Sequence, residues 1–223
     1  QGFDGLRQRC EEYYGLGAKF AKWRAVVNII NNQTPEMVIK ANAQALALYA
    51  STAQSSNLVP IVEPEVLMDG DHSINICRKI TEKTLEIVFS ELENFNVNLK
   101  EIVLKPNMIL PGSNSNENRD SSEIAAQTIE VLKKYVPENV PGIAFLSGGQ
   151  TEIEATENLS SMNMLNDLPW ELTFSYGRAL QHSALNEWKG KKENIIESQK
   201  IFLHRANMNS LAHAGQYSSS NEQ

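Results

Sequence analysis

The sequence has few cysteines, no long apolar run and no excess of basic charge, and each absence excludes a class of function. Cys10 and Cys77 are its only cysteines and have no metal-ligand spacing, so a reduced, cytoplasmic compartment is favoured, although the two thiols can in principle pair. No apolar run reaches the roughly 18 residues of a membrane span, and no signal segment opens the chain, so we expect no membrane insertion. The formal net charge of −7 argues against nucleic acid as a partner, because a phosphate backbone selects basic surfaces.

Apolar strands alternate with helices along the 223 residues. This pattern predicts a parallel sheet covered by helices. Residues 111–120 are polar and are expected to form an exposed loop, and the polar tail at 215–223 is expected to be frayed. The predicted helices span 4–14, 35–54, 73–93, 121–135, 178–188 and 191–213, and the predicted strands end near 24, 65, 105, 147 and 175. Thr34 is the expected cap of the second helix, and the Thr-x-x-Glu spacing of Thr151 and Glu154 suits a capping box. The apolar stripe of the third helix consists of Ile76, Ile80, Ile87 and Val88.

Each predicted strand ends in a polar residue: Lys22, Glu63, Lys105, Ser147 and Ser175. The first four follow one another at intervals of 41 or 42 residues, and the last comes after 28. The carboxyl ends of parallel strands carry the catalytic groups of α/β barrels and the ligands of open doubly wound sheets. A closed barrel needs about eight strand–helix units, and we recognise about five. The fold is therefore either an open sheet or a barrel of which the chain holds only part.

Lys105 follows the apolar run 102–104, and Pro106 then ends the strand because it lacks an N–H group. A lone lysine at a strand end usually reaches solvent. Burial and a second cation, here Lys22, both lower the pKa of a lysine and make it a nucleophile that forms a Schiff base with a carbonyl. Glu63 and Glu65 are candidates for the proton carrier that this reaction needs, the alternative being a surface turn.

Two glycine-containing segments, 147–149 and 176–178, each precede a predicted helix. Backbone N–H groups at such helix starts bind phosphate, and Arg178 adds a forked, charged donor. One such segment alone is weak evidence for a phosphate site, since glycine is common in turns. Together with Lys105, the two segments favour a lysine-imine enzyme that acts on a phosphorylated keto compound.

Five motifs resemble those of the class I fructose-bisphosphate aldolases of eukaryotic type: AKWR at 21–24, VPIVEPE at 59–65, LKPNM at 104–108, FLSGGQ at 145–150 and LTFSYGRALQ at 172–181. The resemblance covers nearly the whole chain. It implies a TIM (β/α)8 barrel, of which this chain supplies about the last five strand–helix units. It also implies a homotetramer that cleaves fructose 1,6-bisphosphate in glycolysis, giving dihydroxyacetone phosphate and glyceraldehyde 3-phosphate, with no metal and no other cofactor.

The resemblance also implies a role for each motif residue. Lys105 forms the Schiff base, Glu63 is the main acid and base, Glu65 supports it, and Lys22 stabilises charge near the reacting carbons. Arg24 lines the pocket, a role that the residues alone do not suggest. The substrate phosphate is held by Ser147, Gly148, Gly149, Ser175, Gly177 and Arg178.

The family has further strands before the segment QGFDGL and a longer C-terminal tail. We therefore expect residues 1–223 to be one partial barrel domain that lacks the N-terminal third and the extreme C-terminal tail of such an enzyme, and to be poorly active alone. Two alternatives stay open. One is another lysine-imine barrel enzyme of aldolase or transaldolase type, and the other is an interaction scaffold for actin or for the cytoplasmic tails of adhesins.

Overall fold

The computed structural model describes residues 2–222, which form a sheet of five parallel strands in the order β1-β2-β3-β4-β5. The strands are β1 (Phe20–Val27), β2 (Val59–Val66), β3 (Val103–Leu104), β4 (Gly142–Phe145) and β5 (Glu171–Phe174). The helices are α1 (Leu6–Gly15), α2 (Glu36–Ser55), α3 (Ile74–Asn94), α4 (Ser121–Tyr135), α5 (Glu152–Asn163), α6 (Arg178–Trp188) and α7 (Ile195–His213), and the 3₁₀ turns are η1 (Leu99–Glu101), η2 (Lys192–Asn194) and η3 (Ser219–Glu222).

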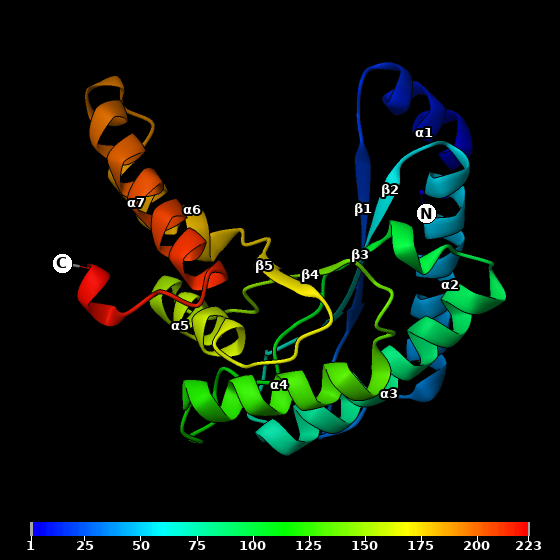
Figure 1. The fold of residues 1–223 in the computed structure, drawn as a ribbon, viewed down its shortest axis with the longest axis horizontal. Coiled ribbons are helices and arrows are strands. Elements are labelled where there is room, and N and C mark those ends of the chain that lie inside the picture. The colour runs from blue at the N-terminus through cyan, green and yellow to red at the C-terminus, as the bar shows by residue number, and fades with distance from the viewer. Residues whose placement is uncertain (1, 223) are drawn as a thin grey trace.

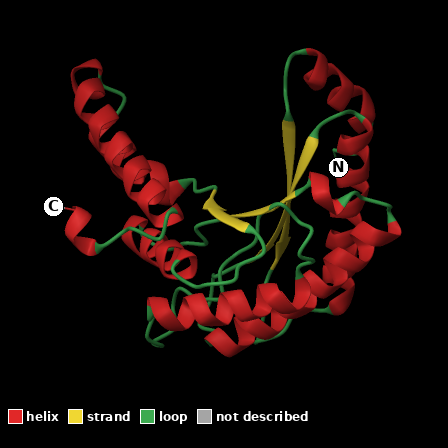
Figure 2. Ribbon diagram, viewed as in Figure 1, coloured by secondary structure: helices red, strands yellow, loops and turns green. Residues whose placement is uncertain are grey.

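The strand order is sequential, with a helix between each pair of neighbouring strands. A doubly wound sheet reverses its order at a switch point, whereas a TIM barrel does not. The helices lie in an arc outside the strands, and the arc is open between α1 and α7 (Figure 1). Figure 2 shows the strands inside this arc. The fold is therefore part of a TIM barrel, with β1 and β5 as its two edges.

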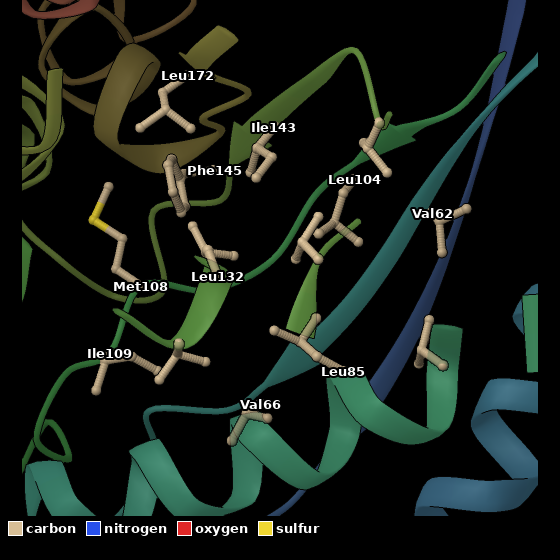
Figure 3. Close-up of a cluster of buried hydrophobic side chains, with 14 of the residues drawn as sticks. Val62, Val66, Leu85, Leu104, Met108, Ile109, Leu132, Ile143, Phe145 and Leu172 are labelled. Carbon is tan, nitrogen blue, oxygen red and sulfur yellow. The ribbon is translucent and has the colours of Figure 1, made fainter. Parts of the chain in front are cut away.

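The two faces of the sheet differ because successive side chains point to opposite sides of a strand. One face packs on the helices and is apolar, with Val62, Leu104 and Ile143 at or near zero exposure. Figure 3 shows these side chains together with Leu85 of α3 and Leu132 of α4. The other face, which we call the lumen face, carries the charged residues of β1 and β2.

The predicted end of the first strand is wrong: β1 continues past Arg24 to Val27, because it pairs with β2 along its full length. The second strand, β2, ends at Val66, one residue after its predicted end. Arg24 lies beside Glu63 in this register. Lys22 and Arg24 are thus inside β1, on the lumen face, rather than at its end.

The predicted helices are confirmed to within a residue or two, except that the last one begins with a separate turn, η2. The capping box at Thr151 and Glu154 is also confirmed. The expected helix cap at Thr34 is wrong: Pro35 occupies the N-cap position of α2, and the Thr34 hydroxyl donates to the Asn28 carbonyl at 2.7 Å. Cys10 and Cys77 are both free and buried, and within residues 2–222 no helix is long and apolar enough to cross a membrane.

The C-terminal tail, which was expected to be frayed, is instead anchored to α7 through Glu222. Arg205, only 5% exposed, donates to both carboxylate oxygens of Glu222 at 2.8 and 2.7 Å. The hydroxyl of Tyr217 donates to the same carboxylate at 2.8 Å. The polar composition that predicted fraying also supplies the ion pair that prevents it.

Lowering the pH is expected to detach this tail. Burial raises the pKa of Glu222, but hydrogen bonds from Arg205, Tyr217 and His204 outweigh it and lower that pKa from 4.5 to about 2. Since the folded pKa is depressed, these contacts contribute fully above about pH 4.5 and are lost as the pH falls through about 2. Amide hydrogen exchange of residues 216–222, relative to that of α2, measures the loss.

Glu222→Gln is the matched control for the tail. The amides of its tail should exchange faster than those of the wild-type chain at neutral pH. The difference in exchange rate between the tail and α2 should no longer change with pH. If wild-type protection of the tail stays constant down to about pH 2, the carboxylate does not control docking.

Candidate active site

Lys105 lies at the end of β3, beside Glu63 of β2. The last backbone hydrogen bond between these strands runs from the Lys105 N–H to the Val62 carbonyl at 2.8 Å, since the next donor on β2 would be Pro64, which has no N–H. The Lys105 Nζ atom is 3.1 Å from Glu63 Oε1. The two residues are 8% and 3% exposed. Lys105 therefore does not reach solvent as an ordinary strand-end lysine would; its ammonium group is held at the lumen face.

Glu63 joins two lysines. Its second oxygen, Oε2, is 2.9 Å from Nζ of Lys22, a contact close enough for an ion pair. The contact lacks hydrogen-bond geometry, and Oε2 is buried without a hydrogen-bond partner among the described residues. The sequence argument placed Lys22 next to Lys105, whereas the structure places the carboxylate between them. Glu63 is thus the shared partner of both amines.

Glu65 forms a second ion pair on the same face. It accepts a hydrogen bond from Nε of Arg24, the residue two positions after Lys22 on β1. This hydrogen bond raises the pKa of Arg24, although burial opposes it. The period of two along each strand therefore aligns one cation–carboxylate pair behind the other.

A cavity of about 260 Å³ opens beside the second pair. Five of the predicted site residues line it: Arg24, Glu65, Gly148, Gly149 and Arg178. Gly148 and Gly149 have φ angles of 52° and 76°, in the left-handed region that favours glycine. Two guanidinium groups and a glycine turn around a small cavity are suited to a phosphate group.

Three other predicted site residues lie in the adjoining loops, and they are not among the described residues that line this cavity. The Ser147 carbonyl accepts two hydrogen bonds from Gln150, one from the backbone at 3.0 Å and one from the side chain at 2.8 Å. The Ser175 N–H donates to the Phe145 carbonyl at 2.8 Å. Gly177 is the N-cap residue of α6.

Sequence reasoning missed Asp69 and Ser113, which also line the cavity. Their two loops are joined by backbone hydrogen bonds, among them Ser113 N–H to the Met68 carbonyl at 2.7 Å. The loop at 111–120 was expected to be exposed, but its first two residues, 111 and 112, are buried. The dipeptides Asp69-Gly70 and Pro111-Gly112 are typical of turns, but no local pattern shows that the two turns are in contact.

Cavity size alone does not identify the site. A larger cavity, of about 470 Å³, lies between the start of α2, the middle of α3 and the end of α4. None of the predicted site residues lines it. The smaller cavity is lined by the Arg24–Glu65 pair, by Arg178 and by the glycine turn, which are the groups suited to binding phosphate.

Part of a (β/α)8 barrel with a buried lysine–carboxylate pair on its lumen face defines a segment of a barrel enzyme suited to imine chemistry. The model of the family described as fructose-bisphosphate aldolase class-I matches residues 1–223. The chain belongs to the class I fructose-bisphosphate aldolase family.

Individual relatives are similar over nearly all of the chain. It is 48% identical over 219 residues to the fructose-bisphosphate aldolase of Dictyostelium discoideum, covering 97% of this chain and 61% of that protein. It is 51% identical over 217 residues to cytosolic fructose-bisphosphate aldolase 4 of Arabidopsis thaliana, covering 97% and 55%. The chain thus spans less than two thirds of the length of these relatives.

A solved structure of the Plasmodium falciparum fructose-bisphosphate aldolase, in complex with TRAP and a small molecule inhibitor, is also similar. The TM-score is 0.95 at 48% identity, and the match covers 98% of this chain and 64% of that one. The backbone arrangement described above is therefore that of a known aldolase over nearly the whole chain.

Proposed function

We propose that this chain carries the imine-forming part of a class I fructose-bisphosphate aldolase, which cleaves fructose 1,6-bisphosphate reversibly to dihydroxyacetone phosphate and glyceraldehyde 3-phosphate in glycolysis. The observation that carries the proposal is the buried contact of 3.1 Å between Lys105 Nζ and Glu63 Oε1. A nucleophilic amine and a proton carrier are thereby adjacent, as Schiff-base formation requires.

The chemistry follows from the positions of these groups. Lys105 gives its ammonium proton to the Glu63 carboxylate, and the neutral amine then attacks the substrate carbonyl. A C–N bond forms while the carbonyl π bond breaks, and the oxygen takes up the proton that the nitrogen loses, which gives the carbinolamine. Glu63, within reach of Nζ, then donates a proton to the carbinolamine hydroxyl, which leaves as water and gives the imine. Lys22, paired with Glu63, stabilises negative charge near the reacting carbons, and Glu65 supports Glu63 from the next position on the lumen face.

The substrate phosphate is assigned to the cavity and the loops around it. Arg24 and Arg178 supply fixed positive charge, and the turn at 147–149 brings backbone N–H groups close to the ligand. Ser175 and Gly177 extend the site along the loop after β5. The proposed phosphate residues are Ser147, Gly148, Gly149, Ser175, Gly177 and Arg178, with Arg24 at the wall of the pocket.

The setting of the whole enzyme is also a proposal. Residues 1–223 act as one partial barrel domain within a cytoplasmic homotetramer, a compartment supported by the cytosolic Arabidopsis relative. Because the described sheet has two open edges, these residues alone should turn over the substrate poorly. Turnover at a rate typical of the family would contradict this last point.

Borohydride trapping tests the proposal. The chain is incubated with dihydroxyacetone phosphate and reduced, and the peptide that contains Lys105 is examined by mass spectrometry. We expect an adduct on Lys105 in the wild-type chain and none in Lys105→Met, because a thioether cannot form an imine. Lys100→Met, which replaces an exposed lysine five residues earlier, should retain the adduct. An adduct that persists in Lys105→Met would assign the imine to another amine.

Binding of a protein partner is a second candidate function, favoured by the solved complex of the Plasmodium relative with TRAP. We propose that this chain can likewise bind actin or the cytoplasmic tails of adhesins through a local surface. Cosedimentation with filamentous actin, with and without fructose 1,6-bisphosphate, tests the actin part. Equal pelleting with and without filaments would contradict it.

A further inference from the structure

Asn107 is a buried residue that the proposed reaction does not use. It is 2% exposed, and its side-chain amide is fully engaged. The Oδ1 atom accepts a hydrogen bond from the Val66 N–H at 3.0 Å. The Nδ2 atom donates to Thr81 Oγ1 at 3.1 Å and to the Met108 carbonyl at 3.0 Å. One amide thus connects the end of β2, the segment after Lys105 and helix α3.

The position of this amide follows from a proline in β2. The Lys105 N–H donates to the Val62 carbonyl, and in a parallel ladder the next bond would run from residue 64 of β2 to the Lys105 carbonyl. Residue 64 is a proline without an N–H, so the backbone ladder is interrupted there, while the Pro106 carbonyl faces the other way and accepts from the Leu146 N–H. The next free donor on β2 is the Val66 N–H, and the Asn107 side chain accepts it. A side-chain amide therefore links the two strands at the place where the backbone no longer does.

The linked segments are those that carry the reacting groups. Glu63 and Glu65 precede Val66 on β2, and Lys105 lies two residues before Asn107. The contact of 3.1 Å between Lys105 and Glu63 thus lies between the last ladder bond, at Lys105 N–H, and the Asn107 bond to Val66. Without the hydrogen bond between Asn107 and Val66, the two strand ends would be joined only on the near side of the Lys105–Glu63 pair, by the Lys105 N–H bond.

We propose that Asn107 is a positioning residue that holds the Lys105 amine against the Glu63 carboxylate, with Thr81 fixing the orientation of its amide. Its role in catalysis rests on the proposed function, because it matters only if Lys105 and Glu63 react. Asn107 acts through these two residues and does not itself contact the substrate. A purely structural amide would affect stability without affecting the reactivity of Lys105.

Two pairs of variants separate these possibilities. Thr81→Val removes the hydroxyl that orients Asn107, whereas Thr84→Val, on the same helix, removes a hydroxyl that donates only to the Ile80 carbonyl of that helix. Both threonines are buried, at 3% and 2% exposure. Asn107→Leu removes the amide itself. Asn209→Leu is its control, since Asn209 is fully buried and bonds to Arg205 and Thr156 instead.

Each variant is measured in two ways after circular dichroism has verified its fold. The first is the rate at which borohydride traps dihydroxyacetone phosphate on Lys105. The second is acetylation of Lys105 by acetic anhydride relative to exposed Lys100, which requires no substrate. We expect trapping to slow about 5-fold in Thr81→Val, as for one lost hydrogen bond, and about 10- to 100-fold in Asn107→Leu. Relative acetylation should rise in both, because the ammonium group loses the fixed carboxylate.

The two controls should match the wild-type chain in both measurements, even where they melt at lower temperature. Trapping and acetylation that are unchanged in folded Thr81→Val and Asn107→Leu would overturn the proposal, as would equal changes in Thr84→Val. If Asn107→Leu does not fold, the comparison of Thr81→Val with Thr84→Val still tests the proposal. If the wild-type chain forms no adduct, the proposed function fails, and the acetylation results alone decide whether Asn107 positions Lys105.

Discussion

Glu63→Gln is expected to slow imine formation on Lys105 by about 10²- to 10⁴-fold, the usual contribution of a general acid or base. The amide keeps the shape of the carboxylate but cannot carry the proton that the carbinolamine hydroxyl needs to leave as water. Glu63 is 3% exposed and contacts both Lys22 and Lys105, so no water-borne acid can easily take its place. The rate of borohydride-trapped adduct, measured by mass spectrometry, reports the effect.

Glu65→Gln is the matched comparison, since this carboxylate lies two residues further along the same face and is paired with Arg24 instead. We expect a smaller decrease than in Glu63→Gln. Both variants are to be compared at a temperature where circular dichroism shows them folded, because removing one partner of a buried ion pair destabilises a protein. If Glu63→Gln traps as fast as the wild-type chain, another group supplies the proton, and Glu63 serves only to hold the lysines.

Much of the fold follows from local sequence patterns. The apolar stripe of α3 and the capping box of α5 mark helices that the structure confirms. The strand boundaries were harder to predict than the helix boundaries, because on β1 and β2 the charged side chains of the lumen face interrupt the apolar pattern while the backbone hydrogen bonds continue. The apolar pattern of such a strand therefore stops before the strand itself ends.

The candidate site, like the fold, could be predicted from the sequence only in part. Spacing alone suggested that Lys105, Glu63 and Lys22 share one edge of the sheet, and the structure brings them into contact. Spacing could not show that the carboxylate lies between the two lysines, because that depends on the register of the strands. Asn107, Asp69 and Ser113 were not identified, since their contacts join segments that are distant in sequence.

Gly112→Ala is expected to lower the free energy of unfolding by about 1–3 kcal/mol, the usual cost of forcing an extra methyl group into a packed site. A Cβ atom at this position would lie 2.4 Å from the Gly70 carbonyl oxygen, 2.8 Å from its carbon and 3.0 Å from the His72 nitrogen. All three are backbone atoms, so no flexible side chain can move aside. The Gly112 N–H also donates to the His72 carbonyl at 2.8 Å, so relief of the overlap would strain this bond. Urea denaturation measures the loss.

The same substitution should weaken phosphate binding, because the two loops that it separates carry Asp69 and Ser113 to the cavity beside Arg24 and Arg178. Gly15→Ala is the control: no heavy atom lies within 4 Å of its added methyl group, and at the end of α1 it should raise stability slightly. If Gly112→Ala unfolds at the same urea concentration as the wild-type chain, the loops are not in close contact in solution. If it is destabilised but binds inorganic phosphate unchanged, the loop contact supports the fold and not the site.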